Sequence, residues 1–141
     1  MSYINPTRKT SKRGNEILLR NSVSEDASEL ISIKTEVISE DVYMLRESDE
    51  ANLTVASEKE DISHHLNNDG SVYIVAECAG SVIGFLEFMN GSLRRIKHSG
   101  MFSMYIRKDF REEGVGSMLL EELIKWAEVH PLIEKLTLAV F

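Results

Sequence analysis

The sequence FREEGVGSMLL, residues 110 to 120, places two glycines, Gly114 and Gly116, immediately before an apolar run with helical spacing. Arg111 lies three positions before the first glycine. The first amides of a helix lack intrahelical acceptors and lie at the positive end of the helix dipole. Glycines there let an anion approach the backbone, and an arginine can add a charge-assisted hydrogen bond. The pattern therefore predicts a loop that binds a phosphate or pyrophosphate.

Two common phosphate-binding patterns do not fit this loop. A Walker loop needs Lys and then Ser or Thr after its second glycine, whereas Ser117 directly follows Gly116 here. The dinucleotide-binding fingerprint needs a third glycine three residues later, where this chain has Leu119. What remains is Arg-x-x-Gly-x-Gly after a strand of large apolar residues.

The hydrophobic periodicity around the loop predicts an α/β fold. The expected strands span 16–21, 71–78, 81–90, 100–106 and 135–140, and the expected helices span about 23–39, 57–68 and 115–129. The strands from 71 to 106 form an antiparallel meander, and the last strand–helix–strand crossover should be parallel and right-handed. In the last helix we expect Leu119, Leu120, Leu123, Ile124, Trp126 and Ala127 to face the core. The residues expected to face water are Glu121, Glu122, Lys125 and Glu128. The sequence thus predicts a mixed, mostly antiparallel sheet flanked by helices.

Composition limits the partners of this chain. Its 141 residues fit one domain, 16–141, preceded by a flexible basic arm, 1–15. The net charge of −7 argues against nucleic acid as a partner. No apolar run approaches the length of a membrane span, and the start lacks the pattern of a signal peptide. A single cysteine, Cys78, excludes a disulfide framework and favours a cytoplasmic location.

The stretch MYIRKDFREEGVGSMLLEELIKWA, residues 104–127, resembles the GCN5-related N-acetyltransferase (GNAT) family. The family's motif is Gln or Arg, two residues, Gly, one residue, and Gly or Ala. Arg111, Gly114 and Gly116 satisfy this motif. The order of predicted elements from about 16 to 140 is also similar to that of the family.

The resemblance implies acetyl-coenzyme A (acetyl-CoA) as the acyl donor. In such enzymes the strand before the loop splays from its neighbour, and its backbone pairs with pantetheine; by position these residues are Met104, Tyr105 and Ile106. The amides expected to hold the pyrophosphate are those of Glu112, Glu113, Gly114, Val115, Gly116 and Ser117. Because the backbone makes these contacts, the side chains of the two glutamates are expected to matter little.

Acetyl transfer to an amine requires a group that removes a proton from it. Glu87 lies in the apolar strand GFLEFM, where desolvation would raise the pKa of a carboxyl toward the range of a general base. The alternative is a strand residue that faces water. Three cations, Arg94, Arg95 and Lys97, and also His98 are weaker candidates for acceptor contacts, and a solvated loop is the competing interpretation.

We expect no metal site. His64 and His65 are adjacent on a helix, so they cannot both face one metal, and the chain has one cysteine.

In the family, the strand that matches 135–140 is followed by an Asn, a short helix with a Tyr and a closing hairpin. This sequence ends at Phe141, so we expect an incomplete domain that lacks the usual last helix and hairpin. The open strand edge predicts a homodimer.

Two functions remain compatible with these patterns. The first is an N-acetyltransferase that acetylates the primary amine of a small molecule, such as an amino acid. The second is a non-catalytic domain that binds acyl-CoA or associates with itself.

Overall fold

The chain folds into one mixed sheet covered by helices on both faces. The computed structural model describes residues 4–40, 54–67, 71–90, 99–128 and 135–138. Its strands are β1 (Thr7–Thr10), β2 (Glu16–Asn21), β3 (Ser71–Cys78), β4 (Ser81–Asn90), β5 (Ser99–Ile106) and β6 (Lys135–Leu138). Its helices are α1 (Ala27–Glu40), α2 (Val55–Asn67) and α3 (Val115–Glu128), with short 3-10 turns at Ser24–Asp26 and Lys108–Phe110.

The sheet follows the chain from β1 to β6 without a change in order. Neighbouring strands are antiparallel from β1 to β5, and β6 joins β5 in parallel after the α3 crossover. The meander and the parallel final strand predicted from the sequence are therefore confirmed. At the β3–β4 turn, Ala79 and Gly80 both have positive φ angles, 52° and 84°, as a tight hairpin turn with right-handed strand twist requires.

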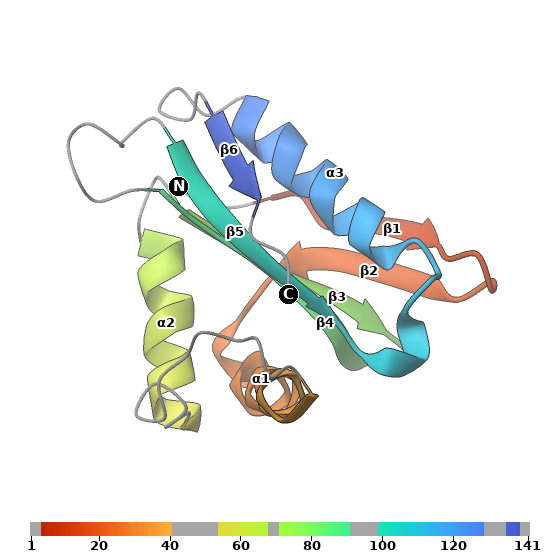
Figure 1. The fold of residues 1–141 in the computed structure, drawn as a ribbon, viewed down its shortest axis with the longest axis horizontal. Helices are drawn as coiled ribbons and strands as arrows, with labels where there is room; N and C mark the ends of the chain where they lie inside the picture. Colours follow the sequence, from red (N-terminus) through yellow and green to blue (C-terminus); the bar gives the residue numbers. More distant parts are fainter. Residues whose placement is uncertain (1–3, 41–53, 68–70, 91–98, 129–134, 139–141) are drawn as a thin grey trace.

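The helices divide the core into two layers, one on each face of the sheet (Figure 1). On one face α3 packs Leu119, Leu123 and Trp126 against the sheet. On the other face α1 and α2 pack Ala27, Leu30, Ile33 and Ile62 against Tyr73, Val75, Val82 and Phe85. Successive side chains of β4 point to opposite faces of the sheet. Leu86 and Phe88 therefore face α3, whereas Phe85 and Glu87 face α1 and α2.

The expectation of a flexible arm over residues 1–15 is wrong for Thr7–Thr10. Thr7–Thr10 form β1, which pairs antiparallel with β2 in the register Thr7 to Leu19. A charged edge strand of four residues has no apolar alternation, because its side chains meet solvent and ion-pair partners instead of the core. The Lys9 ammonium, for example, pairs with Glu121 on α3.

The position of β1 also changes the exposed face of α3. Glu122, which the sequence places in water, is only 4% exposed and lies within 3.5 Å of the Thr7 hydroxyl. Ile124, which the sequence places in the core, is 46% exposed. Because β1, which has no apolar residues, covers part of α3, one acidic residue of the helix is buried and one apolar residue is exposed.

Helix α2 begins two residues earlier than the sequence predicts. The Thr54 hydroxyl accepts a hydrogen bond from the Ser57 amide at 3.0 Å, and the Ser57 hydroxyl accepts one from the Thr54 amide at 3.1 Å. This reciprocal cap makes Val55 the first helical residue. Of the described helices, none has the length and apolar character needed to span a membrane.

Candidate active site

The glycine-bearing loop runs from the end of β5 to the start of α3. Its backbone takes the left-handed conformation twice, at Glu112 with φ 66° and at Gly114 with φ 87°. The first hydrogen bond of the helix runs from the Met118 amide to the Gly114 carbonyl at 3.1 Å. The amides of Val115, Gly116 and Ser117 therefore occupy the first turn, where helical amides have no intrahelical acceptor. This is the local geometry of an anion site at a helix N-terminus.

Gly116 lies at a close approach between α3 and β5. A Cβ atom on Gly116 would lie 3.3 Å from the Met104 Cε and 3.8 Å from its Sδ. The absence of a side chain lets the helix start beside the end of the strand. The two segments expected to bind the donor, Met104–Ile106 and the loop, are therefore neighbours in space.

The Arg111 side chain folds back onto β5. Its Nε donates to the Ile106 carbonyl at 3.0 Å, and its Nη2 donates to the Tyr105 hydroxyl at 2.5 Å. The guanidinium carbon also lies 4.9 Å from the centre of the Tyr105 ring. The arginine of the motif thus fixes the path of the loop against the strand as well as bringing positive charge to it.

The expectation that the side chains of both glutamates matter little is wrong for Glu113. Its residue is 1% exposed, and its Oε1 accepts hydrogen bonds from the Ser11 hydroxyl at 2.6 Å and from Asn15 Nδ2 at 3.0 Å. The Lys12 amide donates to the Glu113 carbonyl at 3.1 Å, and Arg13 Nη1 lies 3.9 Å from Oε2. The hydrogen bond from Ser11, helped by Asn15 and Arg13, lowers the pKa of Glu113 despite its desolvation. The turn after β1 therefore holds the loop.

The strand before the loop, β5, lies between β4 and β6 in the sheet. The parallel pairing of β5 with β6 runs from Ser99 to Phe102, opposite Lys135 to Leu138. Met104–Ile106 pair with β4 on the other edge, as far as Ile106 opposite Gly84. Residues 139–141, which follow β6, lie outside the described residues, so the splaying implied by the resemblance stays a prediction.

Glu87 belongs to a cluster of charged side chains between β4 and the helices α1 and α2. Lys34 Nζ lies 2.7 Å from Glu87 Oε1 and 2.8 Å from Glu58 Oε1. The Tyr73 hydroxyl donates to Glu58 Oε2 at 2.6 Å. Glu87 therefore faces the helices, and the alternative of a strand residue pointing into solvent is excluded. Its side chain retains 20% exposure, whereas Glu58 and Lys34 are buried beneath it.

The expected rise in the pKa of Glu87 is contradicted. Burial disfavours its carboxylate, but the Lys34 ammonium outweighs burial and lowers the pKa below the ordinary value. Burial likewise opposes the charge on Lys34, yet Glu87 and Glu58 together raise its pKa. The sequence of the strand indicates only the desolvation of Glu87, because it does not show that the Lys34 ammonium of α1 lies next to this carboxylate.

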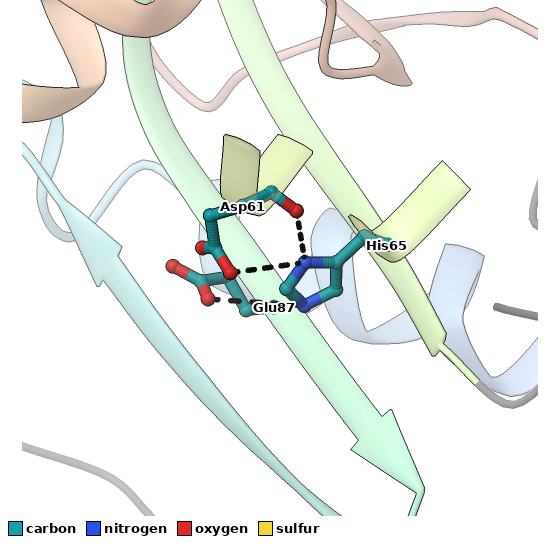
Figure 2. Close-up of side chains that lie close together, drawn as sticks. All are labelled: Asp61, His65 and Glu87. Atoms are coloured by element: carbon teal, nitrogen blue, oxygen red, sulfur yellow. Dashed lines mark hydrogen bonds and ion pairs between the residues drawn. The ribbon is translucent and has the colours of Figure 1, made fainter. Parts of the chain in front are cut away.

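Two further residues of α2 complete the cluster (Figure 2). His65 Nδ1 lies 2.8 Å from the Asp61 carbonyl oxygen and 3.5 Å from Asp61 Oδ1. On the other side of the ring, His65 Nε2 lies 3.9 Å from Glu87 Oε2. Burial, and then the Glu87 carboxylate, raise the pKa of Asp61. The spacing of Glu58, Asp61 and His65 along a helix could have indicated a shared face, although not its contact with Glu87.

This grouping does not lead us to assign a metal. One ligand atom from each of Asp61, His65 and Glu87 falls within 4.8 Å of the others. However, the Lys34 ammonium lies 2.7 Å from Glu87 and 3.8 Å from Asp61, so a cation of the protein already pairs with these carboxylates. The remaining candidates from the sequence, Arg94, Arg95, Lys97 and His98, lie outside the described residues.

Comparisons with known proteins agree with this geometry. Residues 39–141 match the family model described as the acetyltransferase (GNAT) family. An acetyltransferase of the GNAT family from Streptococcus pneumoniae has a similar structure, with a TM-score of 0.77 and 26% identity, over 86% of this chain and 73% of that one. No curated protein matches the chain.

Two more solved structures share the fold. A ribosomal-protein-alanine N-acetyltransferase from Brucella melitensis has a TM-score of 0.68 and 24% identity, over 79% of this chain and 68% of that one. A phosphinothricin acetyltransferase from Sinorhizobium meliloti, solved in complex with acetyl-CoA, has a TM-score of 0.67 and 21% identity. That match covers 92% of this chain and 62% of the other. This chain thus spans between 62% and 73% of the three neighbours.

Proposed function

Because this chain belongs to the GNAT family of acetyltransferases, whose members use acetyl-CoA as acyl donor, we propose that it acetylates the primary amine of a small molecule. The acceptor class that we favour is an amino acid or a similar amine. The observation that carries the proposal is the Arg-x-x-Gly-x-Gly loop, which starts α3 directly beside the end of β5. A carboxylate, Glu87, stands on the same sheet, one strand away, on the face covered by α1 and α2.

In this proposal the donor lies across the loop and the strand end. The pyrophosphate is held by amides between Glu112 and Ser117, of which those from Val115 onward lie in the first helical turn. Pantetheine runs along Met104–Ile106, at the end of β5 beside the loop. Arg111 contributes positive charge at the same place.

The charge of the cluster favours a cationic acceptor. Glu58, Asp61 and Glu87 bring three carboxyl groups, and Lys34 brings one ammonium. Glu87 is the more exposed partner of the Lys34–Glu87 pair, so an incoming ammonium group would meet its carboxylate. We propose that Glu87 receives the proton that the acceptor must lose before it can attack the thioester.

Release of free thiol from acetyl-CoA tests the proposal. The purified chain would be incubated with acetyl-CoA and a panel of primary amines, with mass spectrometry to identify the acetylated product. Amine-dependent thiol release together with a product 42 Da heavier than the acceptor supports the proposal, 42 Da being about the mass that an acetyl group adds on replacing hydrogen. Binding of coenzyme A without turnover on any amine favours the non-catalytic alternative.

We also propose a homodimer in the cytoplasm. Among the described strands β6 is outermost on its side of the sheet, and an exposed strand edge can pair with a second copy. Light scattering after gel filtration over a dilution series measures the mass. A monomer at every concentration contradicts the dimer and leaves the proposed reaction untouched.

A further inference from the structure

The environment of His65 fixes where its proton sits. The ring is 1% exposed, and its Nδ1 lies 2.8 Å from the Asp61 carbonyl oxygen. A carbonyl oxygen can only accept a hydrogen bond, so Nδ1 must carry the hydrogen. In the neutral ring Nε2 then carries a lone pair and can only accept a hydrogen bond. Among the described residues this buried nitrogen has no hydrogen-bond partner, and it points toward Glu87 Oε2 at 3.9 Å (Figure 2).

The charged groups around the ring come from every element packed against it. Helix α2 contributes Glu58 and Asp61, α1 contributes Lys34, β3 contributes the Tyr73 hydroxyl and β4 contributes Glu87. Asp61 lies 3.5 Å from Nδ1 and Glu87 lies 3.9 Å from Nε2, so a carboxylate stands at each end of the ring.

We propose that His65 takes up the proton that Glu87 receives from the acceptor amine, so that Glu87 and His65 act as a two-step proton relay. This inference rests on the proposed function. An N–H bond of the acceptor ammonium breaks, and the proton moves to a Glu87 carboxylate oxygen. It then moves from that oxygen to His65 Nε2, a transfer that requires the 3.9 Å between the two atoms to close to hydrogen-bonding distance in the complex. The neutral amine keeps its electron pair.

The remaining steps balance. The amine nitrogen forms a bond to the thioester carbonyl carbon, the carbon–sulfur bond breaks and its electron pair leaves on sulfur. The second proton of the nitrogen goes to the thiolate, and His65 later returns its proton to solvent through Glu87, whose side chain is 20% exposed. The relay answers a problem posed by Lys34: an ammonium 2.7 Å from Glu87 favours the carboxylate, so Glu87 holds a proton poorly. His65 Nε2 is a second acceptor for that proton, because its lone pair has no hydrogen-bond partner among the described residues.

The test pairs His65→Asn with His64→Asn. Asparagine keeps an N–H that can reach the Asp61 carbonyl but has no group that titrates near neutral pH. We expect His65→Asn to lower kcat about a hundredfold or more, the range of general acid–base catalysis, and to change the pH profile of kcat/KM. Coenzyme A affinity by calorimetry should not change. His64→Asn, on the adjacent residue whose ring centre lies 6.4 Å away, should keep the wild-type profile. An unchanged pH profile in His65→Asn overturns the relay.

A second measurement does not depend on the variant folding or on activity. Nitrogen-15 NMR of the wild-type protein distinguishes the two neutral tautomers of each histidine. The relay requires the hydrogen on Nδ1 of His65, and a neutral ring with its hydrogen on Nε2 contradicts it. If no amine is acetylated, the proposed function fails; if wild type is active and His65→Asn titrates like wild type, only the relay fails.

Discussion

The Ser11 hydroxyl donates a 2.6 Å hydrogen bond to Glu113 Oε1, joining residues 102 positions apart in the sequence. Asn15 donates to the same oxygen, and the Lys12 amide donates to the Glu113 carbonyl. The turn between β1 and β2 thus contacts the loop on both its side chain and its backbone. Because Glu113 directly precedes Gly114, the N-terminal hairpin helps to set the conformation of the proposed donor site.

Removing the Ser11 hydroxyl should therefore weaken donor binding at a distance. In Ser11→Ala the carboxylate loses one of its hydrogen bonds, the loop becomes less fixed, and we expect coenzyme A affinity to fall by several-fold in calorimetry. Thr10→Ala changes a hydroxyl on the neighbouring residue of the same hairpin and is the matched control. Equal affinities for Ser11→Ala and wild type would show that the hairpin does not position the loop.

Glu113 should also make the stability of the protein sensitive to acid. Its pKa in the folded protein lies below the ordinary value of 4.5, chiefly through Ser11. The contribution of the Glu113 carboxylate to folding stability is therefore fully present above a pH equal to that ordinary value. It is lost as pH falls through the lower pKa of the folded state. Chemical denaturation of wild type and Glu113→Gln across this acidic range should show a steeper loss of stability in wild type. Parallel curves would contradict the prediction.

Two of the glycines with positive φ, Gly114 and Gly80, allow the effect of backbone strain to be separated from the effect on donor binding. Gly114 has φ 87° in the loop, and Gly80 has φ 84° in the β3–β4 turn. Valine at either position should cost roughly 1–2 kcal/mol of stability, because a Cβ disfavours the left-handed region. Only Gly114→Val should also weaken coenzyme A binding, measured by calorimetry below the melting temperature of each variant. A similar loss of affinity in Gly80→Val would mean that general destabilisation explains both.

Glu87→Gln should separate chemistry from donor binding. The amide cannot accept the acceptor's proton, so we expect turnover near neutral pH to fall by about a hundredfold or more, the scale of a missing general base. The loop and Met104–Ile106 do not include this side chain, so coenzyme A affinity should stay at the wild-type value. A variant with a wild-type rate and pH dependence would remove Glu87 from the mechanism.

Lys34→Met should be strongly destabilising at neutral pH and less so in acid. Its ammonium neutralises carboxylates of Glu58 and Glu87, and removing one partner of a buried ion pair costs about 3–5 kcal/mol. Without Lys34 the folded state would bind protons more tightly than the unfolded state, so its relative stability should rise as pH falls. Urea denaturation at neutral and acidic pH measures this difference. Adding Glu58→Gln should recover part of the loss.

The sequence predicted best where local pattern and tertiary structure agree. The β-rich runs SVYIVAEC and SVIGFLEFMN became β3 and β4, because their apolar side chains are buried by helices on both faces. The glycines at 114 and 116 marked the loop, since backbone geometry restricts the residue type there.

Long-range electrostatics could not be predicted in the same way. Thr7–Thr10 form a strand although they carry two charges, because their partners are β2 and α3 rather than the core. The sequence around Glu113 is typical of a solvated loop, whereas in the structure its carboxylate accepts hydrogen bonds from Ser11 and Asn15. The direction of the pKa shift of Glu87 depends on Lys34, which is 53 positions earlier in a helix that looks simply amphipathic.

The contact between Ser11 and Glu113 also bears on the order in which the chain acquires its shape during synthesis. A ribosome adds about 5 to 20 residues each second, so the β1–β2 hairpin leaves the exit tunnel about 5 to 20 s before Glu113 does. During that interval its charged strand has neither Glu121 nor the loop to contact. The proposed donor site can therefore reach its final geometry only after nearly the whole described sheet exists, and a nascent chain should be unable to hold coenzyme A until α3 has emerged.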